Sequence, residues 1–550
     1  MVHSRERVGF LGLVSLTLAP VICHGVWRPI ATVLGASGDA AHLSIAALGV
    51  AIVVLVTYVA TAGGKASLSA ATGGSAAMVL SVALGSNTRD RLAEGVALSS
   101  VAAIVSVLVG WLAARLPPAL DGLASRHRGV AVSYALLGVL CIGQTTRVST
   151  FVGDPTRIEF QALPTEHFLD THSCLTAYVQ GAKLANDRVD NLYDANLWPD
   201  MAPQQSLART PTQLRYAPFD LDTFAYPPPF LLLASVLRPF EGHYVAQRAL
   251  WFGMSGLLLA AGLWTVARWL DEERWHRALL LAPVVWLSLP TMVLLQIGNA
   301  QASVTIVAML GMIAFDRKRP ALGGALLSFA ILSKIAPGLL AVWLLAQRRW
   351  REAAWTALFG GVWLSLSVAA FGSTPLLAFV RYELPRLGSG EALRFLADTP
   401  FNIDANLSTF GLPFRFMLAG MPIADPWSAA RKAGLAFTLL VFIVAMISGL
   451  RRRNRRDQAC AWLALLTLGA LRSPFAPGYV CFGALWLLSL VALEVRDARA
   501  AMGLTGLWLI ASFPLPLPPA AAAIAGIAPI ALIDAFLVWV AVRRAPVSAR

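Results

Sequence analysis

Long apolar runs alternate with short basic segments along most of the chain. Apolar runs near 9–25, 43–62, 68–86 and 96–114 open the sequence, a fifth lies near 130–147, and further runs follow toward the end. Uninterrupted apolar runs of this kind are typical of transmembrane helices. Counted along the chain, they predict an all-α polytopic membrane protein with roughly 12–15 transmembrane segments and two large outer loops.

The composition agrees with this pattern. Of 550 residues, 57% are hydrophobic and 13% are charged, whereas soluble domains carry about 25% charged residues. The net charge is +14, and basic residues gather between apolar runs, as in "DRKRP" (316–320), "QRRWRE" (347–352) and "RRRNRR" (451–456). Such segments stay in the cytoplasm. We therefore predict a multi-pass cell-membrane protein in the lipid bilayer, with both termini cytoplasmic and no nucleic-acid partner.

The spacing of these segments divides the chain into parts. Residues 1–129 are predicted to form an N-terminal four-helix membrane extension that begins with an uncleaved helix. Residues 130–495 form a membrane core with outer loops at 148–226 and 372–430, and residues 496–550 form a C-terminal helix pair. Connections between elements are usually short, so two long outer loops indicate a function on that face.

The middle of the core predicts a broken helix. Both "DRKRP" and "QRRWRE" are expected in the cytoplasm, yet at 1.5 Å per residue the segment between them is too short to cross twice. We expect two half-helices that meet near 333–337, where Pro337 ends regular helix. Irregular backbone at membrane depth faces protein or a wet cavity. Lys334 at this break is therefore a candidate functional residue, unless it snorkels to the interface.

The first outer loop holds a candidate catalytic group. Apolar residues recur at helical spacing over 173–184, which predicts a short amphipathic helix on the membrane surface. Asp170 and His172 stand just before it. Asp170 could cap the helix, or it could be a general base that takes a proton from a sugar hydroxyl.

The loop closes on Tyr226 and the three prolines 227–229. Proline is well placed in the first turn of a helix, and aromatic residues concentrate at the headgroup level of membranes. The stretch predicts a stiff start to a membrane helix, with Tyr226 at the bilayer surface.

An ordered series of motifs resembles a known family. The motifs are "NLYD" (191–194), "FAYPPPFLLL" (224–233), "LLQIGNAQ" (294–301), "LSKIAPGLL" (332–340) followed by "QRRWREA", "NLSTFG" (406–411) and "RSPF" (472–475). From about residue 130 to near 490 the chain resembles glycosyltransferase family 87, within the GT-C superfamily of polyprenol-linked-sugar transferases. The resemblance implies a GT-C-like fold for the core.

The resemblance also implies a reaction. It is the transfer of a hexose or pentose from a polyprenyl-phosphate sugar donor to a glycan or glycolipid acceptor, with inversion, on the non-cytoplasmic face. In the family the base is an acidic residue of the first outer loop, in a segment resembling Asp-Phe-x-x-Tyr. Asp170 is the best match here, although its spacing to Tyr178 is longer than in that pattern. Asp154, Glu159 and Glu166 are the alternatives.

The remaining candidate residues follow from the chemistry of the donor. Its leaving group is an anionic phosphate, which needs cations such as Lys334 and Arg472. Amides can bind sugar or phosphate, or they can join helices inside the membrane, and a loop amide such as Asn406 can also cap a helix. The predicted substrate-binding residues are His172, Tyr226, Gln296, Asn299, Gln301, Lys334, Asn406 and Arg472.

No His, Asp or Glu cluster has metal-ligand spacing, so we predict no cofactor and no tightly bound metal, which leaves room for a loosely bound divalent cation.

Two other functions fit a polytopic chain. A transporter or flippase of a lipid-linked or small solute would show two similar halves with matching broken helices, and one broken segment with unequal outer loops favours the enzyme. The other is a non-catalytic subunit of a membrane assembly.

Overall fold

The computed structural model describes residues 144–543, apart from 146, 164–165, 199–210, 273–277, 279–281, 452, 494–502, 504–505 and 508–518. The predicted extension 1–129 and part of the predicted C-terminal helix pair 496–550 lie outside the described residues.

The described part of the chain is helical, with one isolated antiparallel bridge between Asn406 and Pro477. Within it, four helices are long and apolar enough to cross a membrane: α12 (Tyr244–Leu270), α19 (Trp350–Phe371), α24 (Pro426–Gly449) and the segment Ala525–Val542 of α28 (Pro519–Val542). A bent pair, α15 (Leu289–Ile297) and α16 (Gln301–Asp316), adds a fifth if it counts as one span. The predicted all-α polytopic membrane fold is confirmed.

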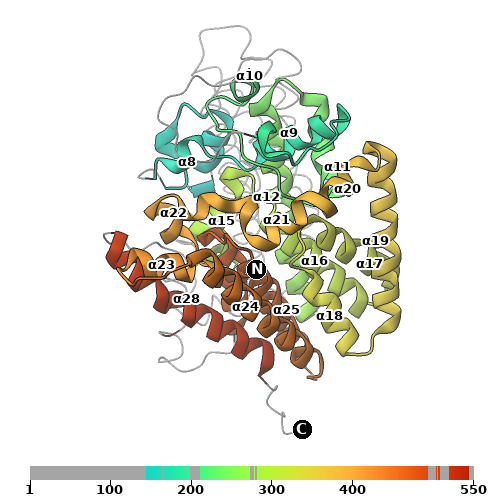
Figure 1. Ribbon diagram of the computed structural model, residues 1–550. Helices are drawn as coiled ribbons and strands as arrows, with labels where there is room; N and C mark the ends of the chain where they lie inside the picture. The colour runs from blue at the N-terminus through green and yellow to red at the C-terminus, as the bar shows by residue number, and fades with distance from the viewer. Residues whose placement is uncertain are drawn as a thin grey trace, which may run out of the picture.

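Most of the short helices form a layer above the long helices in Figure 1, here called the short-helix layer, whereas α23 (Leu412–Leu418) lies lower, against α24 and α28. The first segment, 158–240, contributes η3 (Ile158–Phe160), α8 (Phe168–Thr171), α9 (Leu175–Asn186), η4 (Ala195–Leu197), α10 (Pro211–Leu214), α11 (Phe230–Ala234) and η5 (Ser235–Phe240). The second contributes α20 (Thr374–Ala378), the π-helical turn η6 (Phe379–Glu383), α21 (Leu384–Ser389), η7 (Glu391–Ala397), α22 (Pro400–Ala405), η8 (Thr409–Gly411) and α23 (Leu412–Leu418). Both predicted outer loops therefore carry short helices.

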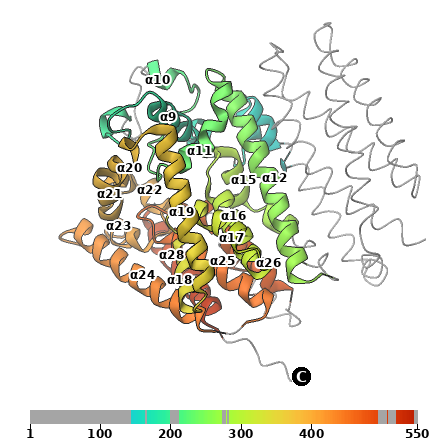
Figure 2. The same cartoon turned by 90° about the vertical axis from the view of Figure 1, so that its right-hand side faces the viewer.

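At the ends that lie far from the short-helix layer, charged residues join the long helices to one another. Arg455, which starts α25 (Arg455–Leu471), lies 3.6 Å from Asp316 and donates to the Trp269 carbonyl at 3.2 Å. Arg543, just after α28, pairs with Asp457 at 2.7 Å. The basic segments thus meet at one end, and Figure 2 shows α12 and α19 running from the short-helix layer toward it.

The predicted broken helix is confirmed. α17 (Pro320–Ser333) and α18 (Gly338–Ala346) are separated by residues 334–337. α19 packs along α17 and continues to the short-helix layer, where Arg188 donates to the Ala370 carbonyl at 3.5 Å. α17 and α18 are shorter than α19 and meet below that layer. The remaining described helices are α14 (Ala282–Trp286), η9 (Gly478–Cys481) and α26 (Phe482–Ala492).

The outer helix α9 forms where the sequence predicts one, but it does not lie on an open surface. Both its apolar and its polar sides are covered by protein, and Tyr178 and Thr176 are fully buried. The polar side chains are buried because each has a partner. Thr176 accepts from the Asp222 amide at 3.0 Å, and Gln180 accepts from the Tyr216 hydroxyl at 2.8 Å.

The proline stretch also differs from the prediction. Residues 227–229 precede the five-residue helix α11, which continues into η5, and the next described helix of spanning length begins at Tyr244. Tyr226 packs against Tyr178 and Phe230, with ring centres 5.1 Å away in each case. The stiff prolines therefore stand inside an aromatic cluster of the short-helix layer, in which the Tyr226, Tyr178 and Phe230 rings pack on one another.

Candidate active site

A cavity of about 850 Å³ lies where the short-helix layer meets the helix breaks. Its lining includes His172 and Asp222 from the outer layer, Asn299 and Lys334 from two breaks, and Tyr479 from η9. Ligand sites typically occupy about 300–1,000 Å³ and combine apolar walls with a few convergent polar groups. The cavity is therefore the candidate active site.

The first break is a sharp turn between α15 and α16, which bend by 105°. α15 ends at Gly298, whose φ of +71° is the left-handed conformation that favours glycine. The turn directs Asn299 and Gln301 to the cavity. The Asn299 side-chain oxygen accepts from the backbone N–H of Gln301 at 2.9 Å, which fixes the start of α16.

The second break brings a cation to the first. Lys334 Nζ donates to Asn299 Oδ1 at 3.3 Å and to Gln301 Oε1 at 3.1 Å. It also lies 5.4 Å from the centre of the Tyr226 ring. Among the described residues Lys334 has no carboxylate partner within ion-pair distance. Its charge is held by neutral groups and is available to an anion.

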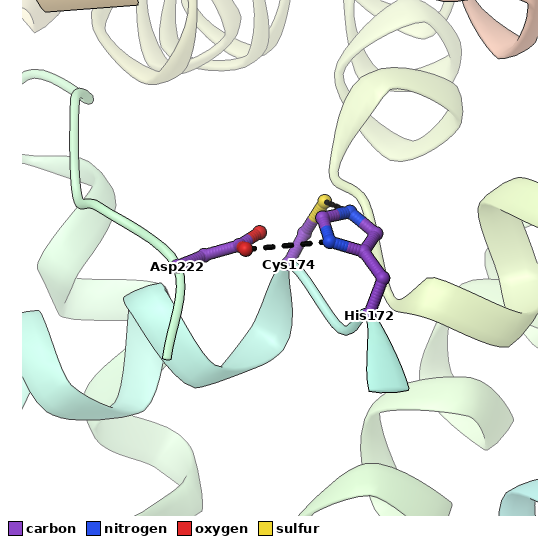
Figure 3. Close-up of side chains that lie close together, drawn as sticks. All are labelled: His172, Cys174 and Asp222. Atoms are coloured by element: carbon purple, nitrogen blue, oxygen red, sulfur yellow. Dashed lines mark hydrogen bonds and ion pairs between the residues drawn. The ribbon is translucent and has the colours of Figure 1, made fainter. Parts of the chain in front are cut away.

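His172, Cys174 and Asp222 form a chain of contacts (Figure 3). His172 Nδ1 lies 3.3 Å from Asp222 Oδ1, and His172 Nε2 lies 3.5 Å from Cys174 Sγ. Asn299 Nδ2 donates to the same sulfur at 3.2 Å. Burial lowers the pKa of His172, but Asp222 and Cys174 outweigh burial and raise that pKa well above its usual value. An imidazolium is thus held against a carboxylate inside the cavity.

These three residues are also the group of potential metal ligands that the described residues bring together, with ligand atoms within 4.8 Å of one another. However, the two contacts of His172 use different ring nitrogens. A metal-bound imidazole offers one nitrogen to the ion and the other to an outer partner. The present arrangement is therefore a hydrogen-bonded chain rather than a shell around one point.

The structure brings most of the predicted substrate-binding residues together. The cavity lining includes His172, Tyr226, Asn299, Gln301, Lys334 and Arg472. Gln296, Asn406 and the predicted base Asp170 are not part of that lining.

Asp170 belongs to the short helix α8 and is engaged by its neighbours. It accepts from Gln161 Nε2 at 2.5 Å and lies 3.2 Å from His167 Nδ1. It does not cap α9, whose N-cap residue is Cys174. Of the alternative carboxylates, Glu166 lines the cavity. Asp154 accepts from Thr156, and Glu159 lies 3.7 Å from Arg157, both outside the lining.

Gln296 and Asn406 join segments of backbone. Gln296 is fully buried, accepts from the Ala162 amide at 2.5 Å and donates to the Leu169 carbonyl at 3.3 Å. Asn406 donates to the Pro474 carbonyl at 2.8 Å and accepts from the Ala476 amide at 3.0 Å. The first holds the outer loop on α15, and the second ties the second outer segment to the link after α25.

Replacing Asn406 with alanine is expected to destabilise the fold by about 1–3 kcal/mol, because it leaves buried backbone groups without partners. Thermal unfolding in detergent would measure this. The matched control is Asn196→Ala at an exposed amide, for which we expect a change within about 0.5 kcal/mol. Equal melting temperatures for the two variants would contradict this role of Asn406.

Sequence reasoning did not single out Asp222, Cys174 or Tyr479 as site residues. Asp222 stands four positions before Tyr226 in "FDLDTFAY" (219–226), next to a motif of the family series. That proximity is the one signal that could have found it. The contact between His172 and Asp222 joins positions on either side of α9 and α10, and no periodicity in the sequence reports such a pairing.

The fold and the cavity define a class: a polytopic membrane protein with a buried polar site that holds a cation and a carboxylate near its short-helix layer. Residues 224–474 match the family model of glycosyltransferase family 87, and this confirms the suspected family over that segment, which leaves the motif "NLYD" (191–194) outside the match. The match supports a glycosyltransferase. No curated protein and no solved structure matched the chain. Tyr226, Asn299, Gln301 and Lys334 lie inside the matched segment.

Proposed function

We propose that the cavity transfers a sugar from a polyprenyl-phosphate donor to a glycan or glycolipid acceptor, with inversion at the anomeric carbon. The observation that carries this proposal is the Lys334 ammonium, which faces the cavity and has no carboxylate partner among the residues that the structure describes. The donor leaves as a lipid phosphate, and a positioned cation stabilises the charge that develops on it. The family match supports the same reaction class.

The surrounding residues divide the remaining work. Asn299 and Gln301 hold the ammonium in place, and Arg472 at the cavity lining supplies a second cation for the phosphate. A carboxylate takes the proton of the acceptor hydroxyl as the bond to the sugar forms. Asp170 is the base predicted from the sequence, and Glu166 and Asp222 are carboxylates that line the cavity.

We further propose that the basic end of the bundle is cytoplasmic, since basic segments stay on that side. The short-helix layer and the cavity then lie on the outer face of the cell membrane. The donor would reach the cavity from the outer leaflet, and the acceptor would reach it from outside.

The test is sugar transfer in proteoliposomes that contain the purified protein, a panel of radiolabelled polyprenyl-phosphate sugars and a lipid extract of the source cells. We expect a labelled product from one donor, with an anomeric configuration opposite to that of the donor when analysed by NMR. If labelled donor or solute crossed the bilayer and no covalent product formed with any donor, the protein would be a transporter.

A further inference from the structure

The outer-loop carboxylates differ in how they are connected to Lys334. From Asp222, a continuous chain of contacts runs through His172, Cys174 and Asn299 to Lys334. The Asp170 contacts lead instead to Gln161 and His167. A base must stand in the same chamber as the group that receives the leaving phosphate, because acceptor and donor meet at one carbon.

We propose that Asp222 is the general base of the sugar transfer, with His172 as its positioning residue. This inference rests on the proposed function. Asp222 is 8% exposed and lines the cavity. The backbone N–H of Asp222 donates to the Thr176 hydroxyl of α9, and Asp222 Oδ1 is paired with His172. Asp222 Oδ2 is therefore the oxygen that receives the proton.

His172 does not take the substrate proton itself. Its Nδ1 faces Asp222 and its Nε2 faces Cys174, so both ring nitrogens are engaged inside the protein. Phe168 stacks on the imidazole with ring centres 4.3 Å apart and limits its rotation. The ring therefore orients the carboxylate and supplies a positive charge beside it.

Cys174 connects Asp222 and His172 to the turn between α15 and α16. Its sulfur lies 3.5 Å from His172 Nε2 and accepts from Asn299 Nδ2 at 3.2 Å. A carboxylate oxygen of Asp222 lies within 4.8 Å of the same sulfur. Asp222 therefore lies close to the turn that holds Lys334.

The transfer forms one bond to the anomeric carbon and breaks another. The acceptor hydroxyl oxygen forms a bond to the anomeric carbon, and its proton passes to Asp222 Oδ2. The bond between the anomeric carbon and the phosphate oxygen breaks, and the phosphate keeps the electron pair beside Lys334. Deprotonation of Asp222 to water restores the site.

The charged and titratable groups around His172 and Asp222 determine how sugar transfer depends on pH. His172 and Asp222 share the cavity with Cys174, Lys334 and the Tyr226 and Tyr479 hydroxyls. With the pKa of His172 raised, its imidazolium persists near neutral pH and keeps a positive charge beside the Asp222 side chain. In His172→Gln the acidic limb of the pH profile of kcat/KM should therefore move to higher pH. A residue with a purely structural role would lower activity without moving this limb.

The experiment compares Asp222→Ala and Asp222→Asn with Asp220→Asn, an exposed acid two positions away, in the proteoliposome assay. We expect kcat to fall by about 100- to 10,000-fold in the Asp222 variants, the usual contribution of a general base, with donor binding retained. Added formate should restore part of the activity of Asp222→Ala, because a small carboxylate can occupy the vacated position. Asp220→Asn should transfer sugar normally.

The outcomes separate this inference from the function on which it rests. If wild-type protein transfers no sugar from any donor, the proposed function fails and the base assignment fails with it. If wild type transfers sugar and Asp222→Asn does so equally well, only the assignment fails. Loss in Asp170→Asn together with retention in Asp222→Asn would return the base to Asp170. Loss on chelation and recovery with Zn²⁺ alone would overturn the assignment in favour of a metal site.

Discussion

Replacing Lys334 with methionine is expected to lower kcat/KM for the lipid-linked donor by about 100-fold or more, the scale seen when one group that stabilises developing negative charge is removed. Methionine keeps an unbranched side chain of similar length, so the break between α17 and α18 should keep its shape. The charge beside Asn299 and Gln301 disappears. The loss should appear mainly in kcat, because the phosphate carries more charge as the sugar leaves it.

Two further variants make the Lys334 measurement specific. Lys432→Met removes an exposed lysine of α24 that does not line the cavity, and it should leave transfer unchanged. Lys334→Arg keeps a positive charge but replaces a compact ammonium with a planar guanidinium, so it should recover only part of the activity. If Lys334→Met transferred sugar as fast as wild type, the cation of the phosphate site would have to be another residue, with Arg472 the first alternative.

The helical architecture could be predicted from the sequence because it depends on local signals. Apolar runs predict the long helices, and basic segments identify the end at which they meet. The break at residues 334–337 followed from chain length alone, because two cytoplasmic segments stood too close for two full crossings. Pro337 then gave its position. None of these inferences needed to know which helix packs on which.

The outer layer was harder to predict, because its helices are buried by segments distant in sequence. The polar side chains of α9 suggested a surface helix, yet Thr176 and Gln180 bond with residues 216–222. The same limit applies to the site. Lys334, Asn299 and Gln301 stood out as polar groups in apolar surroundings, whereas Gln296 and Asn406 looked similar and bond with backbone instead. The residue type shows that a side chain is polar, but it does not show with which group that side chain forms a hydrogen bond.

Replacing Gly298 with alanine is expected to lower transfer by about 10- to 100-fold, because small displacements of groups that position a substrate have effects of this size. Two costs act together at this position. The φ of +71° strains any residue with a Cβ, by roughly 1–2 kcal/mol. The added Cβ also stands 3.1 Å from the Leu175 Cβ and 3.2 Å from the Trp251 ring, so these neighbours must move apart.

The contact of an added Cβ with Leu175 connects Gly298 to the active site. Leu175 follows Cys174 at the start of α9, and Asn299 follows Gly298, so the glycine contact sets the distance at which Asn299 donates to the Cys174 sulfur. Gly242→Ala is the matched control, since its φ is +88° and nothing lies within 4 Å of the added Cβ. Both variants should lose similar backbone stability in thermal unfolding, and only Gly298→Ala should lose transfer. Equal transfer by both would show that the close approach of α9 to the α15–α16 turn does not position Asn299 for transfer.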